Sequence, residues 1–226
     1  MKKKDLLWVA ALAAIVVFLI YPATHKLFVA ATTTHPYIMG FVKVSILATL
    51  GELLALRIVS GDWKKPVGLL WKFIVWGFIG MSFVLVFDLF ANGVTGSMNK
   101  GYLPSIKEKT VWAQLLFAFF TSALMNLIFA PTFMMLHRVT DTFIDLGNGK
   151  LGDIFKVRLR DVVNKIDFYG FFSFIVCKTI PIFWIPAHTI TFMLPPEYRV
   201  LFAALLSVAL GGILAYAKKG GAKAAK

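Results

Sequence analysis

Apolar residues along this chain gather into six long stretches, each bounded by charged residues, Gly or Pro. A helix that crosses the hydrocarbon core of a membrane needs about 20 mostly apolar residues. The first stretch is short for this purpose and the last is marginal. The pattern predicts an all-α, polytopic transmembrane helical bundle of about six membrane helices. The stretches are Leu6–Tyr21, Tyr37–Ile58, Val67–Ala91, Thr110–Leu136, Phe168–Leu194 and Val200–Ala217.

Composition agrees with a membrane location and excludes an ordinary soluble domain. The 226 residues are 59% hydrophobic and 15% charged, whereas soluble domains are about 45–50% apolar and about 25% charged. The formal net charge of +13 has two interpretations. It indicates either nucleic-acid binding or basic loops that fix the orientation of a membrane protein. The positions of the charges decide between them.

The basic residues lie mainly on one side of the predicted membrane. With the N-terminus in the cytoplasm, the inner segments hold 15 of the 24 Lys and Arg residues and the outer segments hold five. This positive-inside pattern predicts that both termini are cytoplasmic. It explains the charge without nucleic acid, and no basic patch with interleaved aromatic residues argues otherwise. The Lys-rich N-terminus, unlike an Arg/Ser-rich presequence, indicates a prokaryotic cytoplasmic (inner) membrane.

The N-terminal stretch has the order of a signal peptide, since Met1–Lys4 is basic and Leu6–Tyr21 is apolar. No clean small-x-small cleavage site follows, because Tyr21-Pro22-Ala23 and Phe28-Val29-Ala30 each begin with a bulky residue. We expect a retained anchor, with a cleaved signal as the alternative. The predicted organisation is an extra helix with an outer connector over residues 1–33, a main bundle over 34–218 and a basic tail over 219–226.

The longest polar segment, residues 137–167, is expected to be a cytoplasmic loop. Apolar residues between Leu151 and Ile166 recur at helical spacing, which predicts a basic amphipathic helix with Asp153 as its N-cap. Such a helix binds anionic lipid at the inner leaflet. Docking of a soluble partner is the alternative. The basic residues predicted to contact lipid are Lys156, Arg158, Arg160 and Lys165.

Three polar residues lie deep inside predicted spans, where such groups are costly and mark functional sites. Counted inward from the outer span ends, Glu52, Asn126 and Lys178 lie at nearly the same depth. We hypothesise that Glu52 and Lys178 form an ion pair that lines a polar path, or that fixes helix registry. Four other charged residues near span ends are interpreted as reaching the membrane interface: Lys43, Arg57, Lys72 and Asp88.

The fifth stretch is the least regular, because Pro181 and Pro186 accompany Lys178, His188 and Thr191. Interior prolines kink helices, and broken helices at membrane depth occur where they line a cavity. This stretch is therefore the predicted functional element, with a packing kink as the alternative. No metal site is expected, because His188 has no second His, Cys or carboxylate at ligand spacing.

Small residues recur every fourth position along the last stretch and so share one helix face. They predict close packing within the monomer, with the seam of a homo-oligomer as the alternative. No Ser-His-Asp grouping, Cys/His cluster or phosphate-binding loop is present in a suitable context, so neither an enzyme nor a cofactor is expected. The positions of the small face are Ala203, Ser207, Gly211 and Ala215.

The C-terminal part contains a series of spaced residues: Trp184, His188, Thr191-Phe192, Pro196 and Tyr198-Arg199. The series resembles the signature of the Mpv-seventeen and peroxisomal membrane protein twenty-two family, which reads Trp-Pro, Gln, Asn-Phe, Pro and an aromatic-Arg pair. His188 stands where Gln is usual, Thr191 stands where Asn is usual, and the Pro has moved from beside Trp184 to Pro186. Near the start, His35-Pro36 and Gly51-Glu52 resemble the family's His-Pro and Gly-Asp.

The resemblance covers residues 34–218 and implies a small integral membrane protein with bacterial relatives. It also implies that Leu6–Tyr21 precedes the family core, which itself has four to five spans. The family is described as forming pores for small solutes. We therefore expect a channel or pore for small solutes or ions, with a polar path near Glu52, Asn126 and Lys178. A non-conducting scaffold that organises lipids or protein partners is the alternative.

Overall fold

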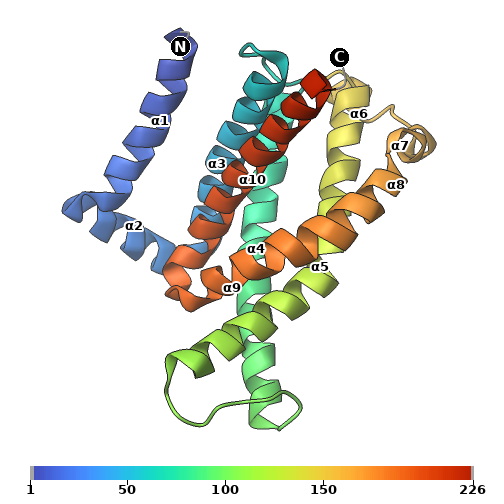
Figure 1. The fold of residues 1–226 in the computed structure, drawn as a ribbon. Coiled ribbons are helices and arrows are strands. Elements are labelled where there is room, and N and C mark those ends of the chain that lie inside the picture. Colours follow the sequence, from blue (N-terminus) through green and yellow to red (C-terminus); the bar gives the residue numbers. More distant parts are fainter. Residues whose placement is uncertain (1–2, 225–226) are drawn as a thin grey trace.

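A computed structural model describes the backbone of residues 3–224, and every regular element within them is a helix (Figure 1). Five helical segments are long and apolar enough to span a membrane, or six if the bent pair α1 (Lys3–Ile20) and α2 (Pro22–Thr34) counts as one. The predicted all-α membrane bundle is confirmed. The other spans are α3 (Pro36–Ser60), α4 (Leu69–Asn99), α5 (Val111–Leu146), Phe168–Met193 and the first part of α10 (Pro196–Ala224).

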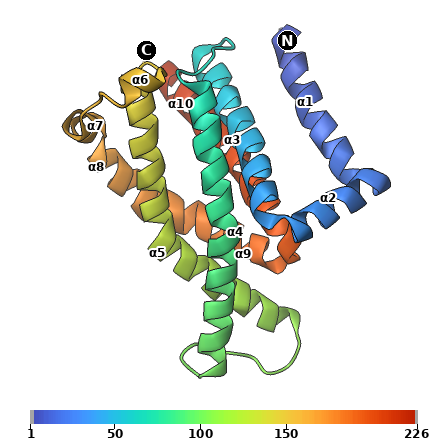
Figure 2. The same ribbon diagram turned by 180° about the vertical axis from the view of Figure 1, so that it is seen from behind.

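The first two helices form an elbow beside the main bundle (Figure 2). Their axes differ by 83° across the break at Tyr21. Pro22 opens α2 at a helical position whose N–H has no partner within the helix. At the far end of α1, Arg57 of α3 donates hydrogen bonds of 2.8 and 3.1 Å to the Asp5 carboxylate. The connector expected after Tyr21 is therefore a second helix.

Helices α3, α4 and α10 pack closely because glycines bring their backbones together. Gly40 and Gly80 face each other, and a Cβ built on Gly80 would lie 2.2 Å from the Gly40 carbonyl oxygen. On another face of α3, a Cβ on Gly51 would lie 3.2 Å from the Cα of Val208 in α10. Lipid provides no hydrophobic force between helices, so such close approach is a main source of helix association.

Helix α5 is longer than expected, because it runs ten residues beyond the predicted end at Leu136 to Leu146. The added turns carry polar residues, and the hydropathy pattern therefore assigned them to the loop. Thr110 caps the first turn by accepting a hydrogen bond from the Ala113 N–H. Pro131 lies inside the helix, and α5 bends along its length (Figure 1). The bend separates a tilted N-terminal part from a steeper C-terminal part.

The fifth span does not break at its prolines. It begins with the short α8 (Phe168–Gly170), continues through the π-helix η1 (Phe171–Trp184), and ends with α9 (Ile185–Met193). Pro181 lies within the π-helix and Pro186 lies in the first turn of α9. π-Helical turns are usually single and often occur at functional sites. The sequence located the irregular segment correctly, but the irregularity is a change of helix type.

In place of the one amphipathic helix predicted between Leu151 and Ile166, the chain forms two short helices, α6 (Leu151–Ile154) and α7 (Leu159–Lys165). Lys150, and not Asp153, is the N-cap of α6. Lys156 pairs with Asp153 at 3.3 Å. Arg158 donates two hydrogen bonds to Asp161, and these hold the pKa of the Asp161 carboxyl below its ordinary value. All four predicted lipid-binding residues are exposed, and two of them already have carboxylate partners.

The predicted basic tail over residues 219–226 continues α10 as far as Ala224, and its last two residues lie outside the described part of the chain. Helix α1 begins, and α10 ends, at the same end of the bundle as α6 (Figure 1). An even number of membrane crossings between the termini agrees with this arrangement.

The Gly40–Gly80 contact generates a prediction about stability. Gly80→Ala should lower the free energy of unfolding by about 1–3 kcal/mol, because the new methyl overpacks the α3–α4 contact. Gly93→Ala on the same helix is the control, because a Cβ there meets nothing within 4 Å. Thermal unfolding in detergent measures both. Equal melting temperatures for the two variants would contradict this account of the α3–α4 contact.

Candidate functional site

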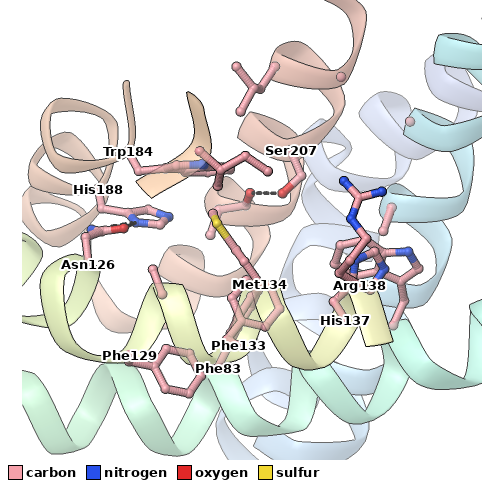
Figure 3. A pocket seen from close by; sticks show the side chains of 18 of the residues that line it. Phe83, Asn126, Phe129, Phe133, Met134, His137, Arg138, Trp184, His188 and Ser207 are labelled. Atoms are coloured by element: carbon pink, nitrogen blue, oxygen red, sulfur yellow. Dashed lines mark hydrogen bonds between the residues drawn. The ribbon is translucent and has the colours of Figure 1, made fainter. Parts of the chain in front are cut away.

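A cavity of about 480 Å³ lies inside the bundle, lined by residues of α3, α4, α5, η1, α9 and α10. We call it the central cavity. Helix α5 contributes lining positions three or four residues apart from Met125 to Asp141, a length of about 24 Å at about 1.5 Å per residue. Most of the lining is apolar, and polar groups gather towards its two ends (Figure 3). Its aromatic rings belong to Trp76, Phe83, Phe87, Phe129, Phe133 and Trp184.

At one end of the central cavity, Asn126 of α5 meets His188 of α9 (Figure 3). The Asn126 amide nitrogen lies 3.0 Å from His188 Nδ1 and also donates to the Ser122 carbonyl oxygen at 2.8 Å. The His188 ring stacks on Trp184 with 5.0 Å between ring centroids. Within the described structure, His188 Nε2 and the Trp184 indole nitrogen form no hydrogen bond, so both can bind a polar group in the cavity.

At the other end of the central cavity, charged side chains of three helices meet. Lys72 of α4 is buried and pairs with Glu52 of α3 at 3.2 Å and with Asp145 of α5 at 3.1 Å. One turn from Asp145, Asp141 lies 3.6 Å from His137 Nε2. The other Asp141 oxygen, Oδ1, is buried without a hydrogen-bond partner. Glu52, His137 and Asp141 line the cavity.

A second cavity of about 720 Å³ adjoins the charged end, between α5, η1 and the segment around α7. Arg138 and Ile175 line both cavities, so the two spaces are neighbours on either side of these residues. Lys165 and Asp167 face the second cavity, which we call the vestibule. The vestibule lies near α7, and Asn126 and His188 lie at the far end of the central cavity.

Beyond Asn126 and His188 the bundle is tightly packed. Thr121 and Ser122 of α5 and Thr191 of α9 are completely buried, and Phe192 is 1% exposed. The Ser122 hydroxyl donates to the Ile185 carbonyl oxygen at 2.7 Å, which fastens α5 to α9. The central cavity therefore ends at this layer.

The structure brings together some of the sequence-predicted site residues and separates others. Glu52, Asn126 and His188 come from three helices and line one cavity, and Thr191 lies in the packed layer beyond it. The hypothesised Glu52–Lys178 pair is wrong, because Glu52 binds Lys72 and Lys178 is exposed. Depth along a helix fixes the height of a side chain, not the direction in which it points.

The interpretation of four charges as interfacial is correct only in part. Lys72 and Lys43 are 7% and 6% exposed, and Lys43 lies 5.3 Å from the centroid of the Phe28 ring. Arg57 is partly buried against Asp5. Asp88 is exposed, and its position relative to the membrane interface stays a prediction.

Some residues of the family resemblance lie at the α9–α10 junction, and the others lie elsewhere in the bundle. Arg199 donates hydrogen bonds to the carbonyl oxygens of Leu194 and Phe192, and its guanidinium lies over the Phe192 ring. The Tyr198 hydroxyl lies 3.0 Å from His25 Nε2 in α2. Trp184 lines the cavity, and Gly51 packs on Val208. Pro36 and Pro196 are the first residues of α3 and α10, and His35 is exposed between α2 and α3.

The small face of α10 lies inside the monomer. Ala203, Ser207 and Gly211 line the central cavity, and Ala215 is buried. The Ser207 hydroxyl donates to the Ala203 carbonyl oxygen within the helix, as Figure 3 shows. A Cβ on Gly211 would have its nearest neighbour, the Gly51 carbonyl oxygen, at 3.9 Å. Small side chains here leave space open as well as allowing close packing.

Sequence reasoning missed the charged end of the cavity. His137, Asp141 and Asp145 were assigned to a loop, although they recur every fourth residue and extend the face of α5 that begins at Asn126. This spacing was the signal that could have found them. Lys72 was missed because its position near a span end suggested an exposed side chain.

The ion pairs of Lys72 generate a second prediction. Lys72→Met should lower the free energy of unfolding by about 2 kcal/mol, since it leaves Glu52 and Asp145 without their shared cation. Lys156→Met, which removes an exposed pair, should change it by about 0.5 kcal/mol or less. Thermal unfolding followed by circular dichroism compares them. Adding Glu52→Gln should restore part of the loss, and equal effects of the two lysine variants would overturn this assignment.

The helices define the general class of the molecule. Five apolar segments that can each cross a membrane, or six with the bent N-terminal pair, fit a multi-pass integral membrane protein. Among the described residues, no group of three His, Cys, Asp or Glu side chains is placed to hold a metal ion. Comparisons of the chain with family models, curated proteins and solved structures find no match.

Proposed function

We propose that this membrane protein conducts small solutes or ions through a path formed by the vestibule and the central cavity. One observation carries the proposal: Glu52, Asn126 and His188, from three different helices, line the same space in the middle of an apolar bundle. Polar groups at membrane depth are costly and are retained where they serve a path or a binding site.

The mechanism would be replacement of hydration along a narrow path. A solute enters from the vestibule, passes Arg138 and the charged end, and moves between aromatic rings. At the far end, His188 Nε2 and the Trp184 N–H offer hydrogen bonds in place of water. The packed layer around Thr191 and Phe192 would separate before release to the other side. We therefore infer that the structure represents a state in which the path is closed at the end away from the vestibule.

A non-conducting scaffold is the second candidate. The exposed basic residues of α6 and α7 and the segment between them favour contact with anionic lipid. A scaffold, however, has no need of an open interior, and the two adjoining cavities therefore favour conduction.

We also propose that the chain is a distant member of the Mpv-seventeen and peroxisomal membrane protein twenty-two family. Supporting this, Phe192, Tyr198 and Arg199 make their contacts where α9 turns into α10, and Trp184 stacks on His188 of α9. A shared signature is expected to persist where it maintains one local structure. Pores for small solutes, as that family is described, agree with the proposed path.

The proposed location is a prokaryotic cytoplasmic membrane, with both termini and α6 and α7 in the cytoplasm. The excess of basic residues in the inner segments supports this orientation. The positions of the chain ends and of α6 at one end of the bundle agree with it. The vestibule would then open towards the cytoplasm.

Filling the cavity should block conduction. Gly211→Leu projects a side chain into the central cavity, where a Cβ has room, and is expected to slow solute flux into proteoliposomes several-fold. Gly212→Leu is the matched control, because Gly212 is the next residue, has similar room and does not line the cavity. Stopped-flow light scattering of liposomes that hold purified protein measures the flux of small polyols and salts.

Two results would count against conduction. Wild-type liposomes as tight as empty ones, under both osmotic and voltage gradients, would remove the basis of the proposal. Equal flux through the Gly211→Leu and Gly212→Leu proteins would place the path elsewhere. Both variants replace a helical glycine with a strong helix former, so a loss of fold is not expected from backbone effects.

The orientation has its own test in intact bacterial cells that express the protein with Cys177→Ser. Phe155→Cys, between α6 and α7 and 81% exposed in the wild type, should react with an impermeant maleimide only after the membrane is opened. Tyr102→Cys, between α4 and α5 and 78% exposed, should react in intact cells. The reverse labelling would invert the proposed topology.

A further inference from the structure

The lining of the central cavity combines aromatic rings with an excess of negative charge. Rings from three helices face the space: Trp76, Phe133 and Trp184 are among them, and Figure 3 labels the last two. Glu52 and Asp141 also line it, and Arg138 is the lining residue of opposite charge. We propose that this cavity selects hydrophobic organic monocations over neutral or anionic molecules of the same shape. This inference rests on the proposed function and adds the class of solute.

The charge count at the mouth favours a cation. The groups facing this region are Glu52 of α3, Lys72 of α4, and His137, Arg138, Asp141 and Asp145 of α5. With His137 neutral, three carboxylates face two cations. Arg138 and Asp145 are both exposed, so solvent screens these two opposite charges, which leaves Lys72 against Glu52 and Asp141. One negative charge remains to be compensated.

Asp141 is the carboxylate with the least compensation. Its nearest basic atom, His137 Nε2, lies beyond hydrogen-bond distance at 3.6 Å, and its Oδ1 has no hydrogen-bond partner. Buried carboxylates normally have such partners. A monovalent cation in the adjoining cavity would supply the missing charge without a direct hydrogen bond, because electrostatic attraction acts over several ångströms at low dielectric.

The apolar part of the lining determines what kind of cation fits. Small hydrated ions gain little from a surface of Phe, Met and Trp side chains, whereas cations with aromatic or alkyl substituents bury apolar area on it. Aromatic faces attract cations, most strongly when water is absent. A volume of about 480 Å³ suits a compact organic molecule. The cavity therefore matches ammonium or phosphonium ions that carry apolar groups.

The test compares two probes of equal shape and opposite charge, tetraphenylphosphonium and tetraphenylborate. Equilibrium dialysis against purified wild-type protein should show saturable binding of the cation and only detergent partitioning of the anion. The Gly211→Leu protein, with its cavity filled, supplies the partitioning background. Asp141→Asn should weaken binding of the cation about tenfold, which corresponds to about 1.4 kcal/mol, and Arg138→Gln should strengthen it.

The comparison of the two probes on wild-type protein needs no variant, so it remains decisive if Asp141→Asn fails to fold. Saturable binding of tetraphenylborate that equals or exceeds that of the cation would overturn the selectivity. Lack of saturable binding of tetraphenylphosphonium would overturn it also. In either case, flux of polyols that is lost in Gly211→Leu would leave the proposed conduction intact, whereas liposomes without any flux would remove both.

Discussion

Helices in a lipid environment gain nothing from hydrophobic association, and this bundle therefore depends on close backbone contact at glycines. Gly40 and Gly80 join α3 to α4, and Gly51 joins α3 to α10. These contacts leave no room for even a methyl group between α3 and α4. They make α3, α4 and α10 one tightly packed unit, on which the position of every lining residue from these helices depends.

The second unit consists of α5, η1 and α9, and it packs differently. Pro131 lies in the bent α5, and η1 is wound as a π-helix. The C-terminal part of α5 is attached to the first unit through the Lys72–Asp145 ion pair and through ring contacts such as that of Trp76 with His137. Its N-terminal part is held by Ser122 and Asn126 against α9. Between these contacts α5 bends and η1 is π-helical, and the central cavity lies beside them.

The sequence predicted the fold class and the positions of the six apolar helical segments, because a long apolar stretch is the direct sign of a helix that can lie in lipid. It also singled out Glu52, Asn126 and His188, which the structure places in the lining of one cavity, because a polar residue in an apolar stretch is costly wherever it points. It did not predict which charged side chains form ion pairs, since Glu52 pairs with Lys72 and not with Lys178. Lys178 and Lys72 both lie in apolar stretches, but the Lys178 side chain points outward and the Lys72 side chain points into the bundle. Tertiary packing sets the direction of a side chain. The helix beyond Leu136 was missed because its residues are polar on the face that meets the charged cluster.

An apolar cavity of this size has a consequence for the protein at rest in a membrane. An unfilled apolar cavity forfeits the dispersion contacts of the side chains that line it, so an empty space of about 480 Å³ would be unfavourable. Water gains little on a surface of Phe and Met, whereas an acyl chain from a neighbouring lipid suits it well. Every solute would then displace a lipid tail, and the apparent affinity of the site would change with the lipid composition of the bilayer.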